Sequence, residues 1–383
     1  MDWRVTLADV NLGIEEENAV LEVLRSGWLT MGPVTQAFEN EFADFVGAKH
    51  AIAVNNATAA LHLACMAVGL GPGDEVILPS LTFVATANAV RYTGAKVVFA
   101  DIESEDWLCI CPHAIEEQIT ERTKAIMVMH YGGFACDMTE IMRIAKKYGL
   151  AIIEDAAHAV GASLNGKALG TWGDVGCYSF FGNKNMTTGE GGMLVSNDDQ
   201  LAEKMRIIRS HGMTTLTWDR FKGHASTYDV VELGYNYRLD EIRSAIGREQ
   251  LKKLPAGNAR RELLVNRYRQ TFSEVAPELG LPFAENRGIS SQHIFPVLLP
   301  EGIDKETFRD LLKQDGIQTS FHYPPVHQFK IYQDPLQNYA EMLWMTENVS
   351  RRQVTLPLFP TMTDEQQRLV IESVVKTLKQ MTG

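Results

Sequence analysis

Seven short apolar runs, spread over residues 50–200, leave few folds open to this 383-residue chain. The segments between them, such as 58–68 and 138–149, carry apolar residues at helical spacing. Because the runs are apolar throughout rather than alternating, they predict strands that are covered on both faces. Strands of this kind that alternate with helices predict an α/β fold, with a mostly parallel sheet flanked by helices. The runs are residues 51–54, 75–80, 95–101, 124–131, 150–156, 175–181 and 192–197.

The last run, residues 192–197, is preceded by little that resembles a helix, so we expect an antiparallel strand at an edge of the sheet. After residue 239 the pattern changes to long amphipathic helix, followed by a β-like run at 293–300 and two further helical segments. We therefore predict a large domain of residues 1–250 and a smaller C-terminal α+β domain of residues 251–383. The first ~25 residues are expected to form a helical arm that packs on the small domain.

Composition and charge restrict the class of protein. Apolar residues make up 45% of the chain and charged residues 22%, which is ordinary for a globular protein with a large core. The net charge of −12 disfavours broad binding to nucleic acid or to an anionic membrane surface. No run approaches the ~18 apolar residues of a membrane span, and the N-terminus lacks the pattern of a signal peptide. We expect a soluble cytoplasmic protein.

The five cysteines do not predict a metal centre. They include no Cys-x-x-Cys pair, and Cys109 and Cys111 are too close together for the usual zinc spacing. Reduced structural thiols, as in the cytosol, are the simpler interpretation, and no metal is expected.

The segment Asn55–Thr58 lies between a predicted strand and a predicted helix. Thr58 is placed to cap this helix, and the free N–H groups of the first turn attract anions. The segment therefore predicts either a phosphate-binding site or an ordinary helix cap, and by itself it does not distinguish the two.

A carboxylate and a histidine follow the apolar pair Ile152–Ile153. Asp155 comes at the carboxyl end of this buried strand, where open α/β sheets bind ligands. A carboxylate there could hold a cationic heterocycle nitrogen, because a buried charge needs a partner. His158 follows three residues later. A polar network at a domain edge is the alternative interpretation for the pair.

Residues 177–197 combine a strand that ends near Ser179 with a polar loop that carries Lys184 and leads into another strand. A single lysine in a loop is usually solvated. Together with Asp155 and the segment around Thr58, however, Lys184 completes the groups that a pyridoxal phosphate site requires. These are an amine that forms a Schiff base, an acid for the pyridinium nitrogen and a phosphate site.

Two glycine-rich segments are excluded as nucleotide-binding motifs. Residues 161–168 approach the P-loop pattern, but Ala168 has no hydroxyl for Mg²⁺, and Asn165–Gly166 predicts a hairpin turn. Residues 69–75 lack the G-x-G-x-x-G spacing and are interpreted as a turn.

Six blocks of the chain, in the expected order, resemble the DegT/DnrJ/EryC1/StrS family of sugar aminotransferases. An ordered set of this kind is far more specific than any single motif, and it extends over nearly the whole chain. The resemblance implies the fold of fold-type I pyridoxal phosphate enzymes. The blocks are residues 26–64, 78–90, 152–162, 178–197, 233–246 and 320–327.

The resemblance also implies roles for single residues. Lys184 matches the lysine that binds pyridoxal 5'-phosphate and then moves a proton, and Asp155 matches the acid that keeps the ring nitrogen protonated. Phe83 matches the aromatic residue that stacks on the ring, and His158 matches a residue that contacts its other side groups. Residues that match the phosphate contacts are Ala57, Thr58 and Ser179, with Asn236 reaching the phosphate from the other subunit of a homodimer.

An intact Lys184 favours transamination over the dehydration of relatives that carry histidine there. The resemblance implies L-glutamate as the amino donor and a keto sugar linked to a nucleoside diphosphate as the acceptor. A 4-keto-6-deoxyhexose is favoured over a 3-keto sugar because the block SFFGNK resembles perosamine synthases. The product would be an amino sugar of a lipopolysaccharide O-antigen or an antibiotic. The alternatives are a keto cyclitol or other ketone as acceptor, and a non-catalytic sensor.

The residues expected near the sugar nucleotide are Trp28, Thr30, His322 and His327, for which ordinary packing is the alternative. Residues 211–231 are expected to form either a lid over the anionic nucleotide or a solvated loop. The side chains that suggest the lid are Trp218, Arg220, Lys222 and His224.

Overall fold

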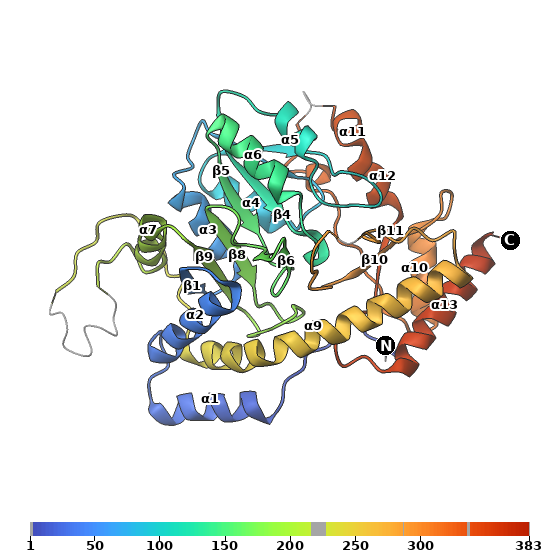
Figure 1. Cartoon of the computed structure of the whole chain (residues 1–383), viewed down its shortest axis with the longest axis horizontal. Coiled ribbons are helices and arrows are strands. Elements are labelled where there is room, and N and C mark those ends of the chain that lie inside the picture. Colours follow the sequence, from blue (N-terminus) through green and yellow to red (C-terminus); the bar gives the residue numbers. More distant parts are fainter. Residues whose placement is uncertain (1–2, 216–226, 286, 335–337, 383) are drawn as a thin grey trace.

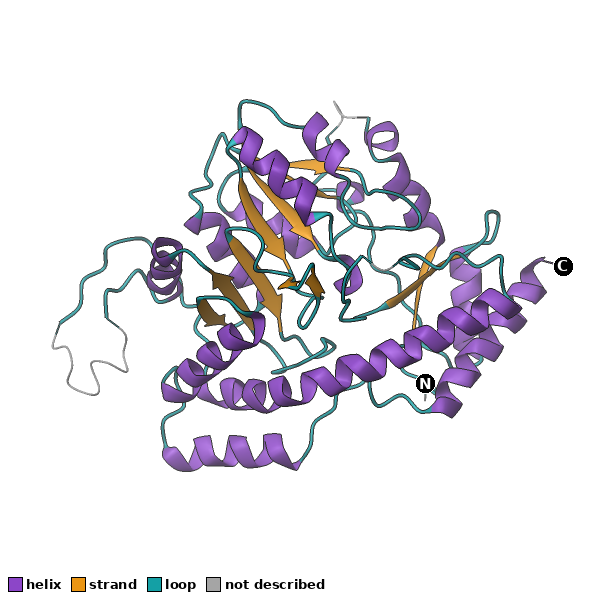
Figure 2. Cartoon of the chain, in the orientation of Figure 1, coloured by secondary structure: helices purple, strands orange, loops and turns teal. Residues whose placement is uncertain are grey.

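The computed structural model describes residues 3–215, 227–285, 287–334 and 338–382. The fold is built around one seven-stranded sheet (Figure 1, Figure 2). Its strands are β1 (His50–Val54), β2 (Glu75–Pro79), β3 (Lys96–Ala100), β4 (Thr123–Met129), β5 (Ala151–Asp155), β8 (Val175–Ser179) and β9 (Gly192–Ser196). Their order is β1-β9-β8-β5-β4-β2-β3, and the pairs from β8 to β3 are parallel. The predicted α/β fold with a mostly parallel sheet is confirmed.

Helices cover both faces of this sheet. They are α2 (Pro33–Val46), α3 (Ala57–Ala67), α4 (Val84–Tyr92), α5 (Pro112–Glu117), α6 (Met138–Tyr148) and α7 (Asp199–Arg209). Ile52 and Val54 of β1 lie in a core with α3, α4 and α7, whereas Ala51 and Ala53 lie in a core with α2. A third core joins α5 and α6 to β2 and β4. Because neighbouring side chains enter different cores, the strands are apolar throughout.

The prediction of an antiparallel strand at 192–197 is confirmed, but its place at the edge is wrong. β9 is antiparallel to β8 on one side and to β1 on the other. β1 takes the edge because it pairs with β9 along its whole length, from His50 opposite Ser196 to Val54 opposite Gly192.

A further core lies in the C-terminal part of the chain, which combines helices with a two-stranded antiparallel sheet. Its elements are β10 (Phe295–Leu298), α10 (Lys305–Gln314), β11 (Gln353–Leu356) and α13 (Asp364–Thr382). Phe295, Phe308, Leu356 and Val374 each pack in this core. The remaining elements are η1 (Tyr131–Gly133), β6 (Ser163–Leu164), β7 (Lys167–Ala168), η2 (Val326–Gln328), α11 (Tyr339–Met342) and α12 (Trp344–Arg352).

The 35-residue helix α9 (Glu241–Val275) runs from the large sheet to the C-terminal part (Figure 1). Its early turns contact α1 (Ile14–Ser26) and α2, and its later turns contribute Leu264 and Tyr268 to the C-terminal core. The predicted boundary near residue 250 therefore falls inside a continuous helix. The division into residues 1–250 and 251–383 stays a prediction.

The predicted N-terminal arm consists of two different segments. Helix α1 (Ile14–Ser26) lies along α9, where Glu16 forms an ion pair with Lys253 at 2.7 Å. Residues 3–13, which precede α1, are not helical but reach the C-terminal part, where Val5 forms a parallel bridge with Ile317. The arm is thus helical only over 14–26, and it is the preceding segment that packs on the C-terminal part. Over the described ranges, no helix has both the length and the apolar character needed to cross a membrane.

The predicted hairpin turn at Asn165–Gly166 is confirmed, because β6 and β7 form an antiparallel hairpin over residues 163–168. Asn165 and Gly166 form its turn with positive φ angles of 51° and 76°. Such angles are favourable for asparagine and glycine in two-residue hairpin turns.

Candidate active site

A cavity of about 280 Å³ lies at the carboxyl ends of β5 and β8, where open α/β sheets bind ligands. The first turn of α3, the residue before α4 and the loop between β8 and β9 complete its wall. The structure thereby brings together residues that are far apart in the sequence. The predicted site residues that line the cavity are Ala57, Thr58, Phe83, Asp155, His158, Ser179, Lys184 and His322.

Lys184 lies in the turn that connects β8 to β9. Its backbone N–H donates to Phe181 O at 2.9 Å, and the Thr188 N–H donates to Phe180 O at 2.9 Å, which fixes this turn over the cavity. Burial lowers the pKa of Lys184 to about 8, while the Asp155 carboxylate acts in the opposite direction. Near neutral pH, a larger fraction of such an amine is unprotonated than of a solvated lysine, so more of it is available as a nucleophile or base.

Asp155 is buried at the end of β5 and accepts two hydrogen bonds. Thr86 Oγ1 donates to Oδ2 at 2.7 Å, and the Ala157 N–H donates to Oδ1 at 3.1 Å. Thr86 Oγ1 is also 2.8 Å from Thr82 Oγ1. Burial raises the pKa of Asp155, and these donors together with Lys184 lower it. Since each carboxylate oxygen can accept two hydrogen bonds, Asp155 keeps capacity for a cationic group in the cavity.

The first turn of α3 presents backbone N–H groups to the cavity. Asn56 Oδ1 accepts from the Ala59 N–H at 2.8 Å, so Asn56 and not Thr58 caps the helix. The predicted cap is wrong because α3 begins at Ala57, which makes Thr58 its second residue. The N–H groups of this turn have no acceptor within the helix and attract anions. A Cβ at Gly192 would lie 2.7 Å from the Asn56 carbonyl carbon, so glycine lets β9 approach this turn.

Aromatic and imidazole rings form another part of the wall. The rings of Phe83 and Tyr323 are 5.6 Å apart, and Tyr323 Oη is 2.8 Å from His158 Nε2. The Gly132 N–H donates to His158 Nδ1 at 3.2 Å, so Nε2 carries the proton and donates to Tyr323. Burial holds the pKa of His158 well below its usual range, and nearby Lys184 acts in the same direction. His158 is therefore neutral.

Among the residues of the site that were not predicted from the sequence are Tyr323, Thr86 and His293. Tyr323 follows His322 in a block that carries the family resemblance, and this block is the signal that could have indicated it. Thr86 supports Asp155 from α4, and His293 Nε2 lies 3.5 Å from Lys184 Nζ. Thr86 also lies in such a block, residues 78–90, whereas no local pattern marks His293, because its partner is distant in the sequence.

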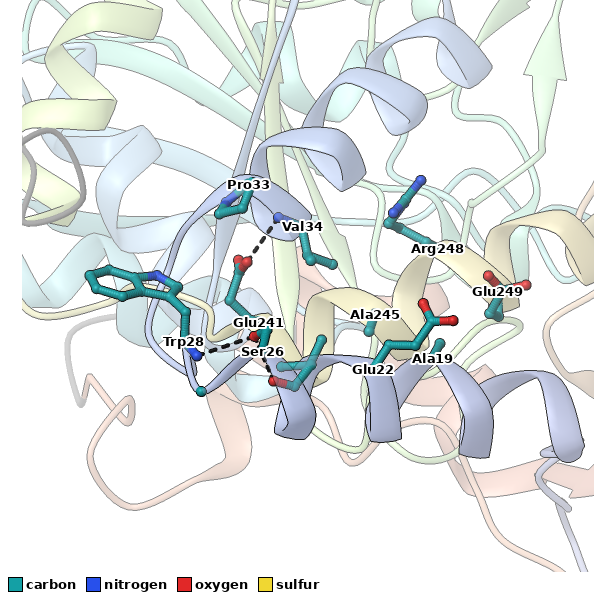
Figure 3. Close-up of a pocket in the computed structure, with 12 residues that line it drawn as sticks. Ala19, Glu22, Ser26, Trp28, Pro33, Val34, Glu241, Ala245, Arg248 and Glu249 are labelled. Carbon is teal, nitrogen blue, oxygen red and sulfur yellow. Dashed lines mark hydrogen bonds between the residues drawn. The ribbon is translucent and has the colours of Figure 1, made fainter. Parts of the chain in front are cut away.

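One of the predicted substrate residues, Trp28, lines a separate groove of about 670 Å³ between α1, α2 and α9 (Figure 3). Trp28 lines one end of this groove, and Thr30 is exposed in the same turn. Glu241 holds the turn in place because its carboxylate accepts hydrogen bonds from the backbone N–H groups of Gly32 and Val34 at 2.8 and 2.9 Å. The roles of Trp28 and Thr30 stay predictions.

His327 and Asn236 also lie away from the lining of the cavity. His327 is buried, with Nδ1 2.7 Å from Ser80 Oγ and Nε2 2.7 Å from Glu347 Oε1, which links η2 to the end of β2. Asn236 is exposed and forms a β-bridge with Ser210. An exposed position is what a residue that reaches the cavity of a second subunit would need. The predicted lid residues Trp218, Arg220, Lys222 and His224 lie outside the described residues.

This sheet, with a lysine and a carboxylate at its carboxyl edge, defines an aminotransferase of fold type I. The model of the DegT/DnrJ/EryC1/StrS aminotransferase family matches residues 11–375, and the chain therefore belongs to that family. The resemblance recognised in the sequence is confirmed.

Individual relatives cover nearly the whole chain. The spore coat polysaccharide biosynthesis protein SpsC from Bacillus subtilis (strain 168) is 42% identical over 96% of this chain and 95% of its own. The structure of the aminotransferase TlmJ from Streptoalloteichus hindustanus has 33% identity, 99% and 100% coverage of the two chains, and a TM-score of 0.91. Helicobacter pylori PseC, an aminotransferase involved in the biosynthesis of pseudoaminic acid, has 32% identity, 99% and 100% coverage, and a TM-score of 0.90.

The donor groups of the cavity fit the cofactor that the family implies, pyridoxal 5'-phosphate. Lys184 supplies an amine, and Asp155 supplies a buried carboxylate with spare acceptor capacity for a protonated ring nitrogen. The first turn of α3 and Ser179 supply N–H and hydroxyl donors suited to a phosphate. Phe83 supplies an aromatic face, and 53% of its surface is exposed.

Proposed function

We propose that the protein is a pyridoxal phosphate-dependent aminotransferase that moves the amino group of L-glutamate to a keto sugar linked to a nucleoside diphosphate. The observation that carries this proposal is the amine of Lys184, whose pKa is lowered by burial and which lines one cavity with the carboxylate of Asp155. Membership of the family supports a sugar as the acceptor, as do the roles of SpsC in spore coat polysaccharide biosynthesis and of PseC in pseudoaminic acid biosynthesis.

Each group of the cavity has a part in this proposal. The bound cofactor would act as an electron sink for the negative charge that forms when the substrate carbon loses a proton. Lys184 holds the cofactor and, once its amine is free and neutral, takes up and returns a proton at Nζ. Asp155 keeps the ring nitrogen protonated, and Phe83 packs on the ring face. Residues proposed to complete the site are Ala57, Thr58 and Ser179 for the phosphate, with His158 and His322 beside the ring and the substrate.

We further propose that the active unit is a homodimer with shared sites. No arginine contributes to the cavity lining over the described ranges, although both substrates are anions. Asn236 is exposed, and Arg238 nearby has a buried Nη1 that lacks a hydrogen-bond partner among the described residues. A second copy could supply both side chains to the phosphate end of the cavity. The exposed residues Val230 and Leu233, at 53% and 78%, would be covered by the same contact.

The acceptor we favour is a 4-keto-6-deoxyhexose nucleotide, as perosamine synthases use, rather than a 3-keto sugar. The support is the sequence resemblance of the block before Lys184. The product would then be an amino sugar for an O-antigen or an antibiotic, made in the cytoplasm. The second candidate acceptor is a keto cyclitol, and a panel of keto sugar nucleotides and keto cyclitols would separate the two.

The first test is the absorption spectrum of the purified protein with pyridoxal phosphate, before and after addition of L-glutamate. We expect a visible band that L-glutamate bleaches, which would also exclude a non-catalytic sensor. A band that does not respond to L-glutamate would reject this donor and favour another donor or dehydration. The absence of a band after reconstitution would reject the cofactor.

Lys184→Ala is the matching variant. It should lose the band and lower turnover by about 10⁴-fold or more, because it removes both the covalent partner and the base. Lys167→Ala is the control, since Lys167 is an exposed lysine of β7 outside the cavity lining. Turnover that survives in Lys184→Ala would contradict the proposal.

A further inference from the structure

His293 lies beside Lys184, on the side of the cavity that faces the C-terminal part. Its Nε2 is 3.5 Å from Lys184 Nζ, and the residue is 5% exposed. It directly precedes Ile294 and the strand β10, so the C-terminal part of the chain places it. Its backbone N–H donates to Gly132 O at 2.9 Å, which ties this segment to the turn beside His158.

Two asparagine amides determine which nitrogen of His293 carries the proton. Asn258 Nδ2 donates to Val160 O at 3.0 Å, so Asn258 Oδ1 is an acceptor. Asn185 Nδ2 donates to this oxygen at 2.8 Å and to Ser291 O at 2.6 Å. Asn185 Oδ1 therefore faces His293 Nδ1, at 2.9 Å. Because an amide oxygen can only accept, Nδ1 is the protonated nitrogen of His293.

Burial and the groups around His293 keep its ring neutral. Burial holds its pKa well below the usual range, and His158, Lys184, Arg261 and His322 act in the same direction. The ring of His158 is 4.3 Å away, and Arg261 Nη1 donates to His293 O at 3.2 Å. A neutral ring with its proton on Nδ1 turns the lone pair of Nε2 toward Lys184. His293 can thus only accept a hydrogen bond from the lysine amine.

We propose that His293 is a positioning residue for Lys184: its Nε2 accepts a hydrogen bond from Nζ and stabilises the ammonium form of the free lysine. This inference rests on the proposed role of Lys184. When the lysine has taken up a proton, His293 would hold the charged amine beside the cavity, and the proton stays on Nζ. Asn185 and Asn258 act through His293 because they fix its tautomer.

The test measures the protonation of Lys184 in the cofactor-free protein, so it requires no turnover. The protein is labelled with trace acetic anhydride over a range of pH, and the modification of Lys184 is quantified by peptide mass spectrometry. In the wild type we expect a midpoint near 8, the value to which burial lowers the pKa of Lys184. Failure of the proposed function would appear in the spectrum with L-glutamate, and failure of this inference would appear only in the labelling midpoint.

His293→Leu should lower the midpoint by about one pH unit, because the ammonium form loses its acceptor. In His293→Gln the midpoint should return most of the way to the wild-type value, since the glutamine amide oxygen reaches about as far from the backbone as Nε2. Asn185→Leu should also lower the midpoint, because the ring is then free to turn an N–H toward Lys184. His113→Leu, at an exposed histidine of α5, is the matched control and should leave the midpoint unchanged.

Two outcomes would overturn the proposal. An unchanged midpoint in His293→Leu would mean that the contact is packing alone. A raised midpoint would mean that His293 opposes the charge on Lys184, as a protonated ring would. If His293→Leu does not fold, as judged by its melting curve, Asn185→Leu and His293→Gln decide the question, since an unchanged midpoint in the first variant contradicts control of the tautomer.

Discussion

Asp155 and Glu241 are both buried carboxylates, 4% and 2% exposed, but their surroundings use them in different ways. Glu241 accepts four hydrogen bonds, from the N–H groups of Gly32, Val34 and Thr35 and from the Thr35 hydroxyl, all within 2.9 Å. Asp155 accepts two and lines a cavity.

The comparison separates a structural carboxylate from a binding one. Glu241 neutralises the positive end of α2 and fixes the turn that carries Trp28, so little acceptor capacity remains for a ligand. Asp155 keeps free lone pairs, and burial raises its pKa, so a cation that enters the cavity would stabilise its charged form. Burial alone does not distinguish the two carboxylates, whereas the number of donors does.

The largest expected effect is that of Asp155→Asn. The amide has nearly the same shape but cannot hold a protonated ring nitrogen, so turnover should fall by about 10³-fold. The stability of the cofactor-free protein should not fall, because burial disfavours the carboxylate. Turnover and urea unfolding measure the two effects. Near-normal turnover of Asp155→Asn would show that catalysis does not require the Asp155 carboxylate.

The next effect concerns pH and uses Lys184→Met. Burial lowers the pKa of Lys184 to about 8 in the folded protein, whereas an unfolded lysine has a pKa of about 10.4. Between these values the unfolded chain binds more protons, so the free energy of unfolding rises with pH through this window. The stability advantage of Lys184→Met over the cofactor-free wild type should therefore shrink by roughly 2 kcal/mol from pH 7.5 to pH 10. Urea unfolding at several pH values measures this difference, and parallel curves would contradict it.

Glu241→Gln should affect stability rather than chemistry. Its amide keeps one acceptor but turns an N–H group toward a backbone N–H at the start of α2, which should lower the free energy of unfolding by about 2 kcal/mol. Turnover by the folded variant should remain close to that of the wild type. A large loss of turnover without a loss of stability would contradict the interpretation of Glu241 as a structural carboxylate and of Asp155 as a binding one.

The smallest effect tests whether the groove of Figure 3 contributes to substrate binding. Trp28→Ala should raise KM for the sugar nucleotide about tenfold, the amount expected for the loss of one aromatic contact, and leave KM for L-glutamate unchanged. Steady-state kinetics with each substrate varied in turn would show this. Equal KM values in variant and wild type would leave Trp28 as a packing residue.

Much of the site could be predicted because its residues follow strands or begin a helix. Asp155 and Ser179 end β5 and β8, and parallel strands bring their carboxyl ends to one edge of the sheet. Lys184 lies in the connection after β8, so the same reasoning places it nearby. Ordered sequence blocks then connected these positions to Phe83, which precedes α4.

The contacts that orient these residues could not be predicted from strand ends. His293 approaches Lys184 across 109 residues of sequence, and Tyr323 approaches His158 across 165. Both come from the C-terminal part of the chain, whose position depends on α9 continuing unbroken past residue 250. Helical periodicity indicates that a helix forms, but the cores at its two ends determine what it connects.

The sequence by itself determined the α/β architecture and the residues around Lys184, because periodicity and strand ends are local properties of the chain. The resemblance of its ordered blocks indicated the family. The tertiary structure decided that β1 takes the edge beside β9, that Asn56 caps α3 and that Trp28 lies in a groove of its own. It also decided the tautomer of His293, through Asn185 and Asn258. These features depend on which distant groups share a hydrogen bond or a core, and only the packed chain brings such groups together.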